Sequence, residues 1–230
     1  MRKVLFNKEA ETKMANKKKA LVWLSVGALA VVIFIGICLF VAIRQRQLSK
    51  VEAWRGDQYL FSGKGQTADA VRHLEKALRL DPNNDEAERN LLQAYLQLKQ
   101  HRNIIAMKTT QLTAATPNEW DNFHRRIRIA ESHIELGEID KAKKIFQSLS
   151  ERYKNAPSSY LGLAECYEKE GNFSDAAKEQ EVAVSIMKQN PKYTPKTFLK
   201  KEMQKLIDLY KQAGQEDSAN KWSQELLALK

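Results

Sequence analysis

Residues that could bind a metal or activate a substrate are few in this 230-residue chain, and their spacing does not bring them together. A zinc site needs histidine, cysteine or carboxylate ligands that converge on one point. His124 and His133 are nine residues apart, which places them on opposite faces of a helix. Cys38 lies inside a long apolar run and Cys166 far outside it, so they cannot form a disulfide. We therefore expect no metal site. The histidines should lie on helix surfaces or in a groove, and Cys166 should be a small packing residue rather than a catalytic thiol.

Carboxylates are abundant, but they cluster where helices are expected to begin or to face solvent. There they interact favourably with the helix dipole and with basic residues one turn away, which explains them without an acid–base pair. The sequence also lacks a G-x-G-x-x-G loop, a Walker loop, an H-E-x-x-H helix and a C-x-x-C pair. We therefore expect no catalysis, no cofactor and no small-molecule substrate. The clustered carboxylates are Asp81, Asp85, Glu86, Glu88, Glu165, Glu168 and Glu170.

The net charge of +10 is unevenly distributed along the chain. Residues 1–19 contain seven basic and two acidic residues and account for half of it. The remaining positive charge is spread over residues 44–230 and forms no basic patch interleaved with aromatic residues, as nucleic-acid binding would require. We therefore expect no nucleic-acid partner and relate the basic tail to membrane topology and anionic lipid.

A stretch of 24 residues, Ala20–Ile43, carries no charge. At about 1.5 Å per residue such a helix extends roughly 36 Å, enough to cross a hydrocarbon core of about 30 Å. A buried core helix is the alternative, but core helices are rarely this long or apolar on all sides. We predict a single transmembrane helix over 20–43, preceded by a basic tail over 1–19.

Lys17, Lys18 and Lys19 precede the apolar stretch, as in a cleavable secretory signal. Signal peptides have apolar regions of about 7–15 residues followed by small residues at the cleavage site, and this stretch has neither feature. We therefore predict an uncleaved signal anchor. Seven basic residues before the stretch, against four in a similar length after it, favour a cytoplasmic N-terminus in the inner membrane and a periplasmic C-terminal domain.

Residues 44–50 are rich in helix formers, so we expect a helical connector that continues the span to about Phe61. Beyond residue 51, a spacing of 34 residues relates Phe61 to Tyr95 and Gly137 to Gly171. Each of these residues lies in the same kind of segment, which consists of an apolar helix, a polar or glycine-containing turn, and a second amphipathic helix. Repeats of this kind stack because no single helix pair buries its apolar face alone.

This pattern resembles the tetratricopeptide repeat (TPR) family. The resemblance implies an all-α fold, with a TPR-like α-solenoid of about five helix-turn-helix repeats over 51–230, beginning near residues 51, 85, 123, 157 and 200. The second repeat departs most from the family pattern, with Lys99 for glycine and Ile104 for alanine, both at or after the turn that precedes its second helix. We expect longer connections at 109–119 and 188–197. Small residues should let the helices approach each other, and aromatic residues such as Tyr95 and Tyr167 should be core.

In the TPR family, defined positions of each first helix face a concave groove that binds protein partners. Transferred to this sequence, they predict a partner-binding groove of mixed charge. The carboxylate clamp of chaperone co-factors is not expected, because only Arg55 is compatible with it. The predicted groove residues are Arg55, Tyr59, Arg89, Gln93, Ile127, Glu131, Leu161 and Glu165, with Lys201 and Asp208 in the last repeat.

The resemblance implies a single-pass anchored scaffold or assembly factor for a membrane or envelope complex, with integral-membrane or periplasmic proteins as partners. Bacterial anchored TPR proteins that associate with secretion and envelope assembly machines have this layout. Three alternatives stay open: a permanent accessory subunit of a larger membrane enzyme, an organelle import receptor of opposite topology, and an enzyme of unrecognised type.

Overall fold

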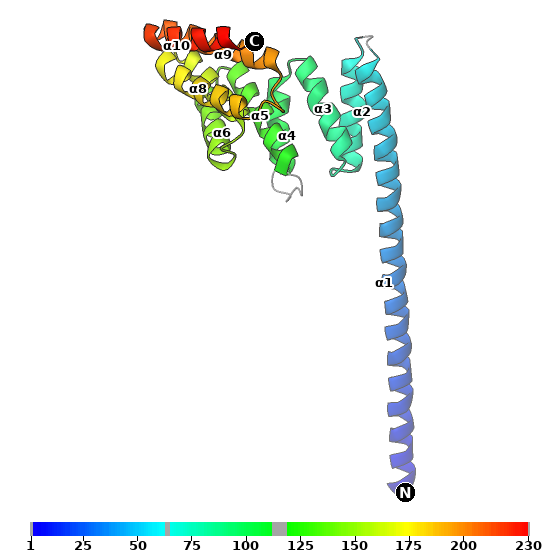
Figure 1. Ribbon diagram of the computed structural model, residues 1–230. Coiled ribbons are helices and arrows are strands. Elements are labelled where there is room, and N and C mark those ends of the chain that lie inside the picture. The colour runs from blue at the N-terminus through cyan, green and yellow to red at the C-terminus, as the bar shows by residue number, and fades with distance from the viewer. Residues whose placement is uncertain (1, 63–64, 112–118, 230) are drawn as a thin grey trace. The chain divides into compact units, whose positions relative to one another are not determined.

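The computed structural model describes the backbone of residues 2–62, 65–111 and 119–229, and the side chains of residues 29–62, 65–107, 119 and 122–229. Within these residues the secondary structure consists of ten α-helices without strands (Figure 1). The helices are α1 (Arg2–Phe61), α2 (Thr67–Leu80), α3 (Asp85–Gln97), α4 (His101–Gln111), α5 (Glu119–Glu135), α6 (Ile139–Arg152), α7 (Pro157–Lys169), α8 (Phe173–Gln189), α9 (Lys196–Gln212) and α10 (Glu216–Ala228).

The chain divides into two compact units, residues 1–94 and 95–230. The first unit is dominated by α1, a continuous helix of 60 residues that contains the predicted connector 44–50. From Leu29 onward, this is the one helix among the described residues that is long and apolar enough to cross a membrane. The side chains of the predicted tail 1–19, and of the first part of the predicted span, lie outside the described residues.

The C-terminal part of α1 packs closely against α2. A Cβ atom at Gly56 would lie only 2.5 Å from Cγ of Leu74, so glycine is needed for this approach of the two helices. Ala53, Ala70 and Leu74 are fully buried at the contact. Close packing of small residues against a leucine holds the base of the long helix, because its apolar groups are removed from water there.

The second unit contains the helical hairpins α5–α6, α7–α8 and α9–α10. One core cluster joins α5, α6 and α7 around Phe146, and another joins α8, α9 and α10 around Met203 and Trp222. The alanines predicted to let helices approach are all fully inaccessible to solvent, as expected: Ala70, Ala130, Ala142, Ala164 and Ala176. Tyr95 is buried as predicted, whereas Tyr167 is half-buried and packs on the edge of a cluster.

The turns between paired helices repeat one backbone conformation. Gly137, Gly171 and Gly214 have φ between 70° and 75°, in the left-handed region that glycine favours. After each, a backbone N–H donates to a carbonyl five residues earlier, such as Asn172 to Tyr167 at 2.9 Å. This is the Schellman arrangement that ends a helix. Lys99 has the same conformation, with φ of 54°.

The predicted helix pairs α1–α2, α5–α6, α7–α8 and α9–α10 agree with the structure, and the differences in their bounds are small. Helices α5 and α9 begin about four residues before the predicted repeat starts at 123 and 200. The second helix of the second repeat, which departs most from the family pattern, is α4. The predicted connection 188–197 is shorter in the structure and covers residues 190–195. Residues 112–118 of the predicted connection 109–119 lie outside the described residues.

Candidate functional site: a concavity in the second unit

The second unit contains a concavity of about 530 Å³ whose walls come from α5 to α9. Ile127 and Glu131 of α5 line it, and so do Leu161 and Glu165 of α7. Each pair is four residues apart, so its two side chains lie one above the other on the same helix face. The structure therefore brings these four predicted groove residues together, whereas Asp208, predicted for the same groove, does not line this concavity.

Two of these four residues are not simply exposed to solvent along the concavity. Ile127 is only 7% exposed and belongs to the core cluster around Phe146, so it supports the wall from beneath. Glu165 is half-buried, and this burial raises the pKa of its carboxyl group. The expectation that the clustered carboxylates lie at helix starts or on solvated faces is wrong for Glu165, whereas Glu88 lies in the first turn of α3 as expected, although it is only 4% exposed.

The floor of the concavity contains a buried polar pair that sequence reasoning missed. Gln180 of α8 is fully buried and donates from Nε2 to the backbone oxygen of Glu202 at 3.1 Å and to its Oε2 at 2.9 Å. Among the described atoms, Oε1 of Gln180 has no hydrogen-bond partner. Gln180 occupies the repeat position at which Leu74 and Phe146 are buried, so a polar residue at an apolar position was the available signal.

The charges around the concavity are mostly paired. Arg128 lies 2.9 Å from Glu131, and Lys205 lies 2.9 Å from Glu168 beside the mouth. Lys201, predicted for the groove, lines it as well. Apolar walls, paired charges and a buried carboxylate are suited to holding a polypeptide segment, since such sites combine apolar area with a few fixed polar groups.

In the first unit the predicted groove residues are dispersed. Arg55 is exposed and pairs with Glu52 at 3.1 Å, whereas Tyr59 stacks on His73 with ring centroids 5.3 Å apart. Tyr59 is therefore half-covered by α2 of its own repeat. Arg89 and Gln93 are exposed one helical turn apart on α3. Partner binding by these four residues stays a prediction.

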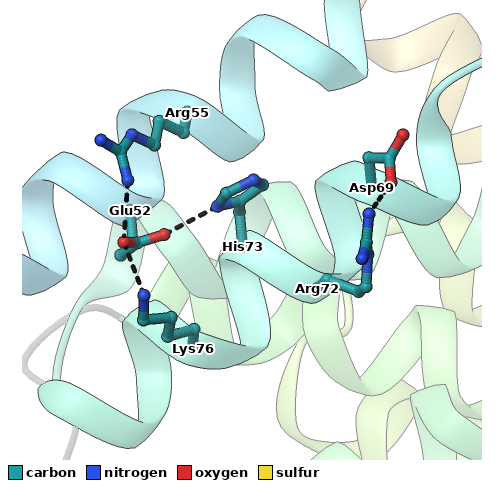
Figure 2. Close-up of polar contacts among 6 residues, drawn as sticks. All are labelled: Glu52, Arg55, Asp69, Arg72, His73 and Lys76. Carbon is teal, nitrogen blue, oxygen red and sulfur yellow. Dashed lines mark hydrogen bonds and ion pairs between the residues drawn. The ribbon is translucent and has the colours of Figure 1, made fainter.

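Glu52 is the centre of a charged cluster between α1 and α2 (Figure 2). Its buried carboxylate lies 2.7 Å from Nδ1 of His73 and 2.9 Å from Nζ of Lys76, in addition to Arg55. The hydrogen bond with His73 lowers the pKa of Glu52 most, Lys76 and Arg55 lower it further, and burial opposes them. This cluster is structural: it ties the base of the long helix to α2.

The histidines and cysteines show no convergence among the described residues, where no group of three possible metal ligands occurs. His133 is an exception to the expected surface placement, since it is 6% exposed and lies 2.6 Å from Glu138. Both cysteines are free thiols. Burial raises the pKa of Cys166 to about 12, so this thiol stays protonated at neutral pH and acts as a packing group.

Stacked hairpins with a 34-residue spacing, glycine-type turns and a concavity lined by both apolar and charged residues are typical of a helical-repeat protein. Two tetratricopeptide repeat family models match the chain, over residues 63–102 and 127–193. The chain therefore contains tetratricopeptide repeats over these two stretches. No curated protein matches its sequence.

Solved structures with the same fold have low sequence identity to this chain. The crystal structure of a MamA protein is 20% identical, with a TM-score of 0.62, over 80% of this chain and 92% of that one. MamA from Desulfovibrio magneticus RS-1 is 13% identical, with a TM-score of 0.59, over 80% and 94%. YrrB, a TPR protein with an unusual peptide-binding site, is 16% identical, with a TM-score of 0.52, over 74% and 81%.

Proposed function

We propose that this chain is a non-catalytic, membrane-anchored scaffold that binds an extended segment of a protein partner in the concavity of its second unit. The observation that carries the proposal is the convergence of Ile127, Glu131, Leu161 and Glu165 on one hollow of about 530 Å³. A repeat fold presents such a surface with a fixed geometry. Peptide binding by YrrB, which shares the fold, is consistent with this use.

The anchor is the apolar part of α1. The side chains from Leu29 to Ile43 are exposed along the helix, which suits contact with lipid rather than with a protein core. We propose an inner-membrane position with residues 1–19 in the cytoplasm and residues 51–230 in the periplasm, on the basis of the flanking charges. A reporter active only in the periplasm, fused after Lys230, should be active. Activity of a cytoplasm-only reporter there would contradict this topology and favour an import-receptor arrangement.

The concavity is tested by changing its half-buried lining and leaving the buried Ile127 intact. In the full-length protein, the triple variant Glu131→Ala, Leu161→Ala, Glu165→Ala should lose partner recovery in mild-detergent co-purification and keep the helical circular dichroism of wild type, with a somewhat lower melting temperature because Leu161 packs against a core cluster. Lys144→Ala, Gln147→Ala offers a matched control, because both residues are exposed on α6 and neither lines the hollow. Unchanged recovery by a folded triple variant would exclude the concavity as the binding surface.

The same co-purification separates an assembly factor from a permanent subunit. We propose an assembly or scaffolding role for a membrane or envelope complex, which predicts several partners in less than equal amounts. One complex of constant stoichiometry on a native gel would instead indicate an accessory subunit of a membrane enzyme.

A further inference from the structure

The part of α1 beyond the apolar span carries exposed apolar side chains on one side. Trp54 is 60% exposed, Phe61 is 67% exposed, and Val51 is 45% exposed. Spacings of three and seven residues place them along one side of the helix. Ala53 and Leu60, which are buried, belong to the opposite side, where α1 contacts α2.

Comparison with the later repeats shows that this exposure is unusual. Phe61 occupies the position taken by Tyr95, His133 and Tyr210 in other repeats, and these three are only 5%, 6% and 5% exposed. Trp54 occupies the position of Met203, which is fully buried. The first repeat therefore has the side chains of a covered surface, but this surface is open among the described residues.

The later repeats also show what covers this position. The hydroxyl of Tyr210 donates to Glu181 of α8, and Nζ of Lys143 of α6 lies 4.3 Å from the ring centroid of Tyr167. In both cases the cover is the second helix of the preceding repeat. On α1, the described contacts of this region are with α2 and with Asn84 and Asn90, which bond Ser49 and Asp57. A helix in the place of α6 or α8 would complete the first repeat.

Charge and distance restrict what that helix can be. Phe61 follows the end of the predicted span by 18 residues, about 27 Å of helix, so lipid headgroups do not reach it when the helix stands upright. The same stretch of α1 carries four exposed basic residues, two of which already lie near an acidic residue of this chain: Arg46 is 3.8 Å from Asp81 and Arg55 is 3.1 Å from Glu52. A second copy of this chain would bring these like charges together, which is unfavourable. The basic residues are Arg44, Arg46, Lys50 and Arg55.

We propose that the exposed side of α1 around Trp54 and Phe61 binds an amphipathic helix of a partner protein, whose apolar stripe is flanked by aspartate and glutamate. The proposal rests on the scaffold function proposed above but assigns a second surface, separate from the concavity. The apolar stripe fills the place of a preceding second helix, and the acidic flanks pair with the basic residues of α1.

Two synthetic helical peptides test the proposal. Both carry the same leucine stripe, and their flanking positions are glutamate in one peptide and lysine in the other. Full-length protein in lipid nanodiscs is titrated with each fluorescent peptide, and empty nanodiscs give the background. The glutamate peptide should bind at least about tenfold more tightly than the lysine peptide, and its binding should weaken as salt is raised. The double variant Trp54→Ala, Phe61→Ala should bind the glutamate peptide at least about tenfold more weakly than wild type does.

Two controls separate this surface from the concavity and from unfolding. The triple variant of Glu131, Leu161 and Glu165 should bind the glutamate peptide as wild type does, even if the concavity proposal fails. The helical circular dichroism of the Trp54 and Phe61 variant should be unchanged, because both side chains are exposed. Absence of glutamate-peptide binding, or equal binding of the two peptides, would overturn the proposal. So would self-association of the protein that the double variant abolishes, since a second copy would then be the occupant.

Discussion

At the scale of single residues, Lys99 shows how the repeat tolerates a departure from its pattern. It replaces the glycine of the turn and yet has φ of 54°, in a region where a side chain clashes with the backbone. The Schellman bond is nevertheless made, from the N–H of Gln100 to the carbonyl of Tyr95 at 2.9 Å. The left-handed conformation of the turn is therefore kept although lysine is strained in it.

Lys99→Gly should relieve that strain. We expect the free energy of unfolding to rise by about 0.5–1 kcal/mol. Glycine removes the cost of holding lysine in the left-handed conformation, but part of this gain is lost because glycine has more conformational entropy in the unfolded chain. Chemical denaturation of the full-length protein, followed by hydrogen exchange across α3 and α4, measures the change. The reverse substitution Gly171→Lys is the control and should lower stability by a similar amount, because a Cβ there meets no other atom within 4 Å. A Lys99→Gly variant no more stable than wild type would show that the turn is relaxed.

The site residues illustrate what the sequence could and could not predict. The repeat register placed Glu131, Leu161 and Glu165 on the concavity wall, because a four-residue spacing fixes which helix face they share. It could not show that Ile127 is buried or that Gln180 and Glu202 meet on the floor. Those features depend on packing between helices: Ile127 joins the cluster of α5, α6 and α7, and Gln180 meets Glu202 where α8 contacts α9.

At the scale of helices, the Glu52 cluster connects α1 and α2. The sequence predicted the order of these helices along the chain but not this contact between them. A charged residue in the contact between α1 and α2 was not predicted, because the partners His73 and Lys76 lie more than 20 residues away and share no motif with it. The helices themselves were predictable: hydrophobic periodicity and turn glycines are local signals. Side-chain networks between helices are not local signals, because they depend on which residues of the two helices face each other.

The cluster should make the α1–α2 contact sensitive to acid. Since the pKa of Glu52 is lowered in the folded state from its usual 4.5, the carboxylate contributes stability that is complete above pH 4.5 and is lost as pH falls below it. Glu52→Gln should cost about 1–3 kcal/mol at pH 7, because it removes a buried carboxylate that accepts hydrogen bonds from charged groups, and less at pH 3. Hydrogen exchange over residues 44–80, corrected for the intrinsic rate, reports the opening of this contact.

A matched control comes from an exposed pair on α2. Asp69→Asn breaks the ion pair with Arg72 on the solvent side (Figure 2), where such pairs contribute little. It should change the exchange of residues 44–80 only slightly at either pH. If Glu52→Gln behaved like Asp69→Asn, the cluster would have no role in holding the two helices together.

At the scale of the whole molecule, the continuity of α1 determines how the anchor and the first repeat are coupled. The structure has one helix from Arg2 to Phe61, where the sequence predicted continuity from about residue 20. The predicted connector 44–50 is thus part of a rigid rod, and Ser49 already bonds the carbonyl of Ala77 in α2 at 2.8 Å. Motion of the proposed membrane span should therefore be transmitted directly to the first repeat.

This coupling is tested by inserting four residues after Gln47. Nitroxide labels on the exposed native Cys38 and on Arg72→Cys should give one narrow distance distribution in the wild-type background, while buried Cys166 stays unlabelled. A Gly-Gly-Ser-Gly insertion should broaden the distribution without lowering the melting temperature. An insertion of four alanines should keep it narrow, because it lengthens the helix by about 6 Å instead of breaking it. A wild-type distribution as broad as that of the glycine variant would mean that α1 bends between the span and the first repeat, and that the anchor is a tether rather than a rod.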